Sequence, residues 1–226
     1  METGDVVIIM INSKYKGSNE MEYKTEQERF WAGKFGDCYV DRNKEESLIA
    51  SKTAFFSKAL QKAGPIRTIL ELGSNIGLNE MALNVLFPGI KMDTVEINQS
   101  AADECRKVPN VTVYQDSILT FETERQYDLT FTCGVLIHLN PDSISDVYEK
   151  LYRFSKSYIL VNEYYNPTPI EINYRGETGK LFKRDFAGEM MDQFHDLILI
   201  DYGFVYHRDP SFPLDDTTWF LMKKTQ

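Results

Sequence analysis

The sequence lacks the features that mark membrane-spanning, disulfide-rich and zinc-binding proteins. No apolar run approaches the roughly 20 residues that a membrane-spanning helix needs. The three cysteines, Cys38, Cys105 and Cys133, lie far apart and form no Cys-x-x-Cys pair, which argues against a disulfide framework and a thiolate zinc site. No His-rich or carboxylate-rich spacing requires a metal ion. We expect no metal and no membrane partner, and the cysteine usage fits a reducing cytoplasm.

Basic residues are also in short supply. The chain has 25 Lys and Arg against 34 Asp and Glu, a net charge of -9, whereas binding to nucleic acid regardless of sequence needs a basic surface. We therefore expect no nucleic-acid partner. At 226 residues and 42% hydrophobic content, the chain can form one well-buried α/β domain with a small elaboration. Residues 6–11 are apolar but too short for a secretory signal, so residues 1–25 are predicted to be a tail or an extra strand.

From residue 67 onward, short β-rich runs alternate with amphipathic segments, which is typical of a parallel sheet covered by helices. Strands are predicted at residues 68–73, 91–98, 111–115, 127–132 and 158–163, and helices at 76–87, 100–107, 142–153 and 184–194. Residues 197–207 and 217–224 predict an antiparallel hairpin at one edge. The result is an α/β, Rossmann-like fold with a seven-stranded, mostly parallel sheet and an antiparallel terminal hairpin. The irregular residues 164–183 are predicted to be a substrate-covering insertion.

The turn after the first of these strands suggests a nucleoside-binding site. It carries Gly73, Asn75 and Gly77, and such a turn presents backbone N–H groups and a helix N-terminus to a ligand. Glu96 closes the second strand, where a carboxylate can accept both hydroxyls of a ribose. The dinucleotide fingerprint would need glycines at Asn75 and Leu78, so a nicotinamide-dependent oxidoreductase is only an alternative.

The pattern Glu71-x-Gly73-x-Asn75-x-Gly77 is similar to motif I of the class I S-adenosylmethionine-dependent methyltransferases, which usually have a glycine at Asn75. Asparagine also enters left-handed conformations, so the departure is tolerable. The resemblance implies S-adenosylmethionine as cofactor, with Glu96 on the ribose, Asp116 on the adenine amino group, and the terminal hairpin of that fold. An alternative for Asp116 is to cap a turn with Ser117. The candidate cofactor-binding residues are Trp31, Tyr39, Glu71, Gly73, Ser74, Asn75, Gly77, Glu96, Ile97, Asp116, Ser117, Ile118 and Cys133.

Three further segments, residues 26–43, 134–141 and 163–169, resemble the methylases associated with pseudaminic acid biosynthesis, which are found among flagellin-glycosylation genes. The likeness runs from about residue 24 to 224. It implies a nonulosonic-acid or related sugar acceptor, of the pseudaminic or legionaminic type, in a flagellin or surface-glycan pathway. Residues 26–66 are expected to form a helical lid on a methyltransferase domain at 67–226. Trp31 or Tyr39 could then face the sulfonium, since an aromatic face favours a cation, although these rings could simply pack on the domain.

Methyl transfer is an in-line displacement, so the enzyme mainly positions a nucleophile and excludes water. An alcohol or ammonium acceptor must also lose a proton, and the candidate bases are His138, Glu163, Asp185 and His207. We favour His138, although a hydrogen bond to Asn140 or Asp142 is the alternative. Candidate substrate-binding residues are cations that could clamp a carboxylate or phosphate and tyrosines that could stack on a sugar: Tyr164, Tyr165, Tyr174, Arg175, Lys183 and Arg184.

The sequence is also compatible with other functions. The chain could be a catalytically silent, cofactor-binding scaffold of a glycan-assembly pathway, or a methyltransferase for another small metabolite. The sequence does not fix whether the methyl group lands on oxygen, nitrogen or carbon. It also leaves the identity of the base and the oligomeric state undetermined.

Overall fold

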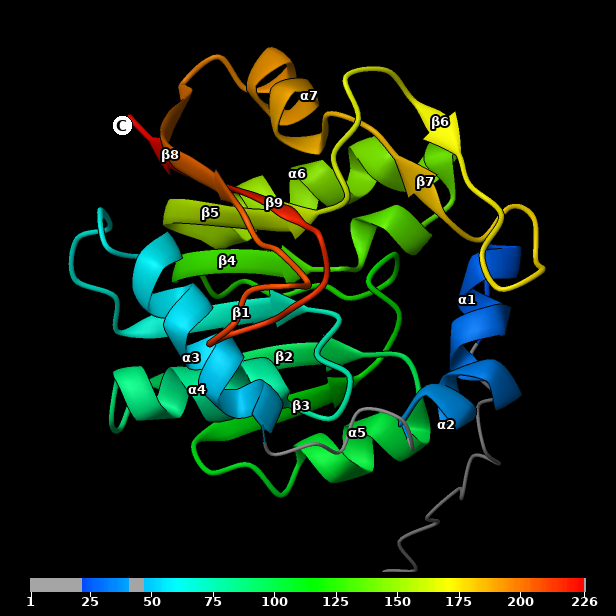
Figure 1. Ribbon diagram of the computed structural model, residues 1–226, viewed down its shortest axis with the longest axis horizontal. Helices are drawn as coiled ribbons and strands as arrows, with labels where there is room; N and C mark the ends of the chain where they lie inside the picture. The colour runs from blue at the N-terminus through cyan, green and yellow to red at the C-terminus, as the bar shows by residue number, and fades with distance from the viewer. Residues whose placement is uncertain (1–21, 41–46, 226) are drawn as a thin grey trace, which may run out of the picture.

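The computed structural model describes residues 22–40 and 47–225. Most of the tail or extra strand predicted in residues 1–25 lies outside the described residues, and so do residues 41–43, the end of the segment 26–43 that carries part of the family resemblance. A seven-stranded sheet forms the centre of the molecule (Figure 1). Its strands are β1 (Thr68–Leu72), β2 (Lys91–Glu96), β3 (Val111–Gln115), β4 (Tyr127–Cys133), β5 (Ser155–Glu163), β8 (Leu197–Phe204) and β9 (Thr218–Lys224).

The strand order in the sheet is β3-β2-β1-β4-β5-β9-β8. Neighbours from β3 to β5 run parallel, and β9 lies antiparallel between β5 and β8. The prediction of a mostly parallel sheet with an antiparallel terminal hairpin is therefore confirmed. The winding direction reverses between β1 and β4, and in such sheets ligands bind beyond the carboxyl ends of the strands at that point.

Helices cover both faces of the sheet (Figure 1). The helices α3 (Ser47–Ala59) and α4 (Leu78–Leu86) pack on one face, α6 (Ile144–Phe154) and α7 (Phe186–Gln193) pack on the other, and α5 (Gln99–Cys105) lies beside β3. Successive side chains of a strand point to opposite faces. In β1, Ile69 belongs to the apolar cluster of Phe56 on α3, whereas Leu70 belongs to that of Leu151 on α6.

Three helices, α4, α6 and α7, begin two residues later than their apolar spacing predicts. The helix α4 starts at Leu78 because Gly77, at its N-cap, has φ = 86°. Before α6, Asn140 accepts a hydrogen bond from the Asp142 N–H (2.9 Å) and caps a 3₁₀ turn, η2 (Pro141–Ser143). A second 3₁₀ turn, η1 (Leu136–His138), follows β4. Local capping thus decides where these helices begin.

The predicted insertion contains its own short hairpin. The strands β6 (Ile170–Glu171) and β7 (Phe182–Lys183) pair antiparallel outside the main sheet. Two-residue strands are too short to show a period-two pattern, so no sequence pattern predicts them. The insertion packs beside α1 at the carboxyl ends of the strands (Figure 1).

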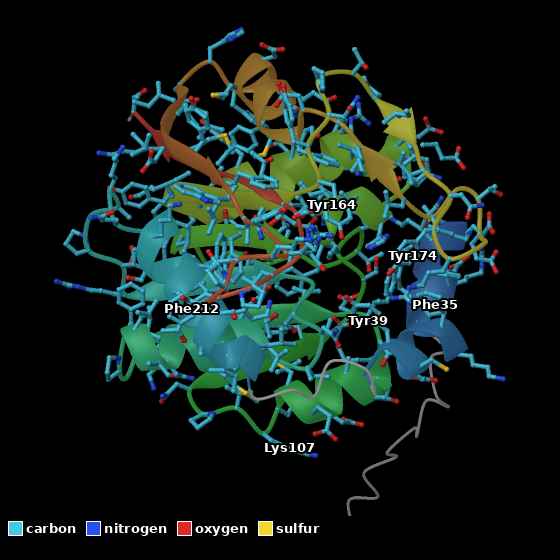
Figure 2. All side chains as sticks on the ribbon, in the orientation of Figure 1. Phe35, Tyr39, Lys107, Tyr164, Tyr174 and Phe212 are labelled. Carbon is cyan, nitrogen blue, oxygen red and sulfur yellow. The ribbon has the colours of Figure 1, made fainter. Side chains whose placement is uncertain are left out.

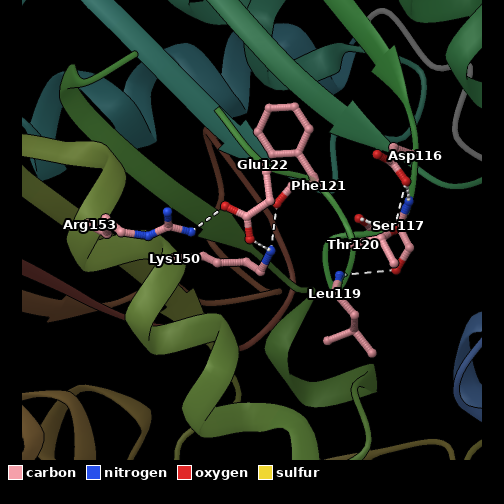
Figure 3. A network of polar contacts seen from close by, with 8 residues as sticks. All are labelled: Asp116, Ser117, Leu119, Thr120, Phe121, Glu122, Lys150 and Arg153. Carbon is pink, nitrogen blue, oxygen red and sulfur yellow. Dashed lines mark hydrogen bonds and ion pairs between the residues drawn. The ribbon is translucent and has the colours of Figure 1, made fainter. Parts of the chain in front are cut away.

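The connection from β3 to β4 is fastened to α6 (Figure 3). The buried Lys150 ammonium donates to the Phe121 carbonyl at 2.5 Å and pairs with Glu122 at 2.7 Å. Glu122 also pairs with Arg153. This network fixes the loop that follows Ser117 at the edge of the ligand crevice.

Two short helices, α1 (Glu26–Ala32) and α2 (Lys34–Val40), lie over the carboxyl ends of β2 and β3 (Figure 1). Thr25 starts α1 with a capping box, in which the Glu28 side chain accepts from the Thr25 N–H at 2.6 Å. Glu28 also accepts a hydrogen bond from the Ser117 hydroxyl. The Asn98 amide donates to the Asp37 carboxylate (3.0 Å) and to the Trp31 carbonyl (3.3 Å). Among the described residues of the predicted lid, α3 packs on the sheet, whereas α1 and α2 lie over the strand ends, where a lid is expected.

Candidate active site

A cavity of about 570 Å³ lies at the carboxyl ends of the central strands, beneath α1 and α2. Its volume falls in the range of roughly 300–1,000 Å³ that is usual for small-molecule sites. Fourteen of the sequence-predicted residues line it: Trp31, Tyr39, Gly73, Ser74, Asn75, Glu96, Ile97, Ser117, Ile118, Cys133, His138, Tyr164, Tyr174 and His207. Nine others do not line it: Glu71, Gly77, Asp116, Glu163, Tyr165, Arg175, Lys183, Arg184 and Asp185.

The turn after β1 has the left-handed backbone that its sequence predicts. Gly73 has φ = 90°, and a Cβ placed there would lie 2.6 Å from a methyl group of Val135. Asn75 has φ = 50°, which agrees with the argument that asparagine can replace the usual glycine at this position. The chain can therefore bend sharply into α4 while the β4 loop packs against Gly73.

Glu96 is a buried carboxylate that faces the cavity rather than a solvated strand end. One of its oxygens accepts a hydrogen bond from the Asn98 N–H and the other from the Asn75 N–H, both at 2.7 Å. Burial raises the pKa of Glu96, and these two N–H bonds oppose that rise. An ionised carboxylate has about four acceptor sites, so Glu96 keeps acceptor capacity for a ligand hydroxyl.

Asp116 is engaged within its own loop. Its Oδ1 accepts from the Ser117 N–H (2.7 Å) and from the Thr120 hydroxyl (2.8 Å), which is the turn-capping alternative (Figure 3). Ser117, Ile118 and the neighbouring Leu119 line the cavity in its place. The loop after β3 thus offers apolar side chains that can pack on a flat ring.

Glu71 is buried below the cavity and begins a polar chain that reaches its wall. Its carboxylate accepts from the Asn79 amide at 2.6 Å, and the Asn79 carbonyl oxygen accepts from the Lys52 ammonium at 2.7 Å. Burial raises the pKa of Glu71 well above its usual value, and the neighbouring Glu80 carboxyl raises it further. Lys52 and Asn79 line the cavity, although neither was predicted as a site residue. Lys52 comes from α3, and no motif in the sequence marks it.

His138 presents a neutral imidazole to the cavity. Its Nδ1 lies 2.7 Å from the Lys180 carbonyl oxygen, which can only accept, so Nδ1 carries the proton and Nε2 keeps its lone pair. Burial lowers the pKa of His138 to about 4. The ring centroid is 4.5 Å from that of Trp31 and 5.0 Å from that of Tyr174. The hydrogen bond expected as the alternative, to Asn140 or Asp142, is replaced by the one to Lys180.

Glu163 ends β5 beneath the turn that carries His138. Its carboxylate accepts from the N–H groups of Val135 (3.0 Å), Leu136 (3.1 Å) and Ile137 (3.4 Å). Burial raises the pKa of Glu163 to about 7, and the three N–H bonds act against this. Glu163 therefore holds the η1 turn in place from outside the cavity.

We expect Glu163 to make stability depend on pH. Its pKa rises from 4.5 in the unfolded chain to about 7 in the folded protein, so the folded state binds more protons between these values. The free energy of unfolding should then fall as pH rises from about 4.5 to 7, by about 3 kcal/mol from this group. Glu163→Gln, which cannot titrate, should lack this component. Urea unfolding of both proteins at pH 5 and pH 8 measures it, and equal pH dependences would contradict the assignment.

The remaining candidates lie around the mouth of the cavity or away from it. Asp185 caps α7 by accepting from the Gly188 N–H at 2.9 Å. The half-exposed His207 pairs with Asp216 at 2.8 Å. Arg184 pairs with Glu189 at 2.7 Å, so its guanidinium is already engaged beside α7.

Aromatic side chains gather at the end of the cavity near β5 and the insertion. Figure 2 shows Tyr39, Tyr164 and Tyr174 close to the ends of the central strands, and all three line the cavity. The Lys183 ammonium lies 4.9 Å from the centre of the Tyr164 ring, and the Arg175 guanidinium 5.7 Å from that of Tyr174. Tyr165 is 42% exposed beside Phe220. The cations Lys183 and Arg175 thus contact the rings of Tyr164 and Tyr174 but do not themselves line the cavity.

Within residues 22–40 and 47–225, no group of three or more His, Cys, Asp and Glu side chains is arranged to hold a metal ion. In the same part of the chain, every helix is too short or too polar to cross a bilayer.

No family model and no curated protein matches the sequence. Solved structures do match. The 1,6-didemethyltoxoflavin-N1-methyltransferase of Burkholderia thailandensis superposes with a TM-score of 0.62 at 14% identity, covering 85% of this chain and 86% of that one. The magnesium protoporphyrin IX methyltransferase of Synechocystis, with bound S-adenosylmethionine, gives 0.65 at 10% identity, covering 91% and 100%. The plantazolicin methyltransferase BpumL, in complex with S-adenosylhomocysteine, gives 0.62 at 12% identity, covering 88% and 94%. The chain therefore has the Rossmann-like fold of class I S-adenosylmethionine-dependent methyltransferases.

Proposed function

We propose that this protein is an S-adenosylmethionine-dependent methyltransferase that acts on a small-molecule acceptor. The observation that carries the proposal is the buried Glu96 carboxylate, which keeps free acceptor sites at the wall of a cavity of about 570 Å³. The left-handed turn at Gly73 and Asn75 adjoins it. Structures of the same fold that bind S-adenosylmethionine or S-adenosylhomocysteine support the choice of cofactor.

The lining residues fit the parts of this cofactor. Glu96 would accept the ribose hydroxyls, and Ile97, Ile118 and Leu119 would pack on the adenine ring. The Gly73 and Cys133 backbones would flank the methionine part, whose carboxylate would meet the Lys52 ammonium. Asp116, whose carboxylate is held by its own loop, would act by shaping that loop.

The cofactor supplies an electrophilic methyl group on a positively charged sulfur. The chain has to orient the acceptor, exclude water and take up one proton as the acceptor atom bonds to the methyl carbon and the carbon–sulfur bond breaks. His138 can take that proton at Nε2, because the Lys180 carbonyl holds the other ring proton. Its low pKa keeps the imidazole unprotonated throughout the neutral range.

We further propose a sugar or nonulosonic acid of a surface-glycan pathway, of the pseudaminic or legionaminic type, as the acceptor. The three segments that resemble pseudaminic acid-associated methylases support it, and Tyr164 and Tyr174 offer ring faces for a sugar. The cavity is not lined by the cations Arg175, Lys183 and Arg184, so recognition of the acceptor would rest on the tyrosines and His138. The cysteine usage supports a cytoplasmic location.

Calorimetric titration with S-adenosylmethionine, S-adenosylhomocysteine and NADH tests the proposal. Micromolar binding of the two adenosyl ligands alone is the expected result. The next step is to measure methyl transfer to a panel of candidate acceptors: nonulosonic acids, their nucleotide-linked forms and unrelated heterocycles. Adenosyl binding without turnover on any acceptor would favour the scaffold alternative, and binding of NADH alone would overturn the assignment.

Lys52→Met should weaken S-adenosylhomocysteine binding about tenfold, because one hydrogen bond between charged groups is lost. Binding of 5′-methylthioadenosine, which lacks the amino-acid part, should stay unchanged. Calorimetry with both ligands gives the comparison, and Lys58→Met, an exposed position on the same helix, is the control. Equal losses for both ligands would show that Lys52 only supports the shape of the cavity.

A further inference from the structure

Residues Gly179 and Lys180 of the insertion contact both α1 and His138. The Gln27 amide on α1 donates to the Gly179 carbonyl at 2.9 Å. The Lys180 ammonium lies 2.5 Å from the Glu26 carboxylate, also on α1. The carbonyl of the same Lys180 accepts the Nδ1 proton of His138 at 2.7 Å. Lys180 therefore connects α1 to the imidazole of His138.

The burial of Lys180 indicates that this junction is specific. Its side chain is 3% exposed, and lysine is almost never fully buried unless its charge is paired. The partners that the structure gives its ammonium within the described residues are Glu26 and the Phe30 ring, 5.2 Å away, and both belong to α1. The Lys180 ammonium lowers the pKa of Glu26. Undocking α1 would remove both of these partners from the ammonium.

The same helix also contacts His138 directly, through the Trp31 ring. On its other side, Glu28 accepts from the Ser117 hydroxyl at the end of β3. The position of α1 thus fixes the Trp31 ring beside the imidazole and the Lys180 carbonyl that accepts its Nδ1 proton. It also fixes Ser117 at the edge of the predicted adenine site.

We propose that Lys180 and Gln27 are positioning residues, which set the tautomer and orientation of His138 only while α1 is docked. This inference rests on the proposed function for the role of Nε2 as proton acceptor. A ring held by the Lys180 carbonyl directs its Nε2 lone pair to the acceptor, whereas a released ring exchanges its proton between the two nitrogens. The base is then assembled only under a covered cavity, which limits attack of water on the methyl donor.

Nitrogen-15 NMR of the imidazole side chains tests this without cofactor or acceptor. The chain has three histidines, His138, His195 and His207, so His→Gln variants assign the signals. The wild type should show His138 as the pure Nδ1–H tautomer, neutral down to about pH 5. Lys180→Met and Gln27→Leu should each introduce the Nε2–H tautomer and raise the pKa of His138 toward its usual value.

The controls separate positioning from general damage. Arg29→Met removes a cation from α1 whose hydrogen bonds, within the described residues, go to the carbonyls of Tyr23 and Thr25, and it should leave the His138 signals unchanged. If Lys180→Met does not fold, the double variant Glu26→Gln with Gln27→Leu takes its place in the NMR test. It removes the same contacts from the α1 side, and it should fold because Glu26 is exposed. A wild-type tautomer in the folded variants would overturn the inference. Calorimetric titration tests the proposed function separately, because it measures cofactor affinity and does not depend on the tautomer of His138.

Discussion

His138→Gln should slow methyl transfer by about a hundredfold or more and leave the affinity for S-adenosylmethionine within about twofold of wild type. Removing a general base typically costs about 10²–10⁴ in rate. The glutamine amide can still donate to the Lys180 carbonyl, as Nδ1 does at 2.7 Å, but it cannot take up a proton. The loss should therefore fall on kcat, measured in single-turnover assays with an acceptor identified by the screen, together with calorimetry of the cofactor.

The matched variant is His207→Gln. His207 also lines the cavity, but its imidazole pairs with Asp216 and its side chain is 52% exposed. We expect its effect on the rate to be small. If His138→Gln kept the wild-type rate and His207→Gln were slow, His207 would be the general base.

Glu96→Ala should weaken S-adenosylmethionine binding by about a hundredfold. A hydrogen bond to a charged group contributes about 1.5–3 kcal/mol, and Glu96 would make two of them to the ribose. The variant also releases the Asn75 and Asn98 N–H groups, which now donate to Glu96 at 2.7 Å. Calorimetric titration with S-adenosylmethionine measures the change.

The control for Glu96→Ala is Glu104→Ala, on α5 nearby, which removes a partly exposed carboxylate paired with Lys107. Its affinity should match that of the wild type. Circular dichroism and thermal unfolding show whether Glu96→Ala keeps its fold. Unchanged binding in a folded Glu96→Ala protein would mean that the carboxylate supports the turn after β1 and does not contact the ribose.

The fold could be predicted because its signals are local. Apolar runs such as residues 68–72 are buried on both faces, and turn residues separate them from amphipathic helices, so strand and helix alternate visibly. The start of α6 was missed because the Asn140 side chain caps an unexpected 3₁₀ turn, and β6 and β7 were missed because they are too short.

The candidate site was predictable where it follows the strands. Glu96 and the turn at Gly73 come directly after buried runs, and parallel strands bring such ends together. Lys52, Gln27 and Lys180 could not be found in this way. They belong to segments before and after the central strands, and only the packing of those segments over the sheet brings them to the cavity or to His138.

The place of β9 has a consequence for the order of folding. β9 lies inside the sheet, between β5 and β8, although it follows β8 in the chain. During synthesis β8 has no partner in the sheet, and β5 presents an unpaired edge, until residues 218–224 have been made. Unpaired edges of apolar strands promote aggregation. Substitutions that slow the docking of β9 should therefore lower the yield of folded protein more than they lower its equilibrium stability.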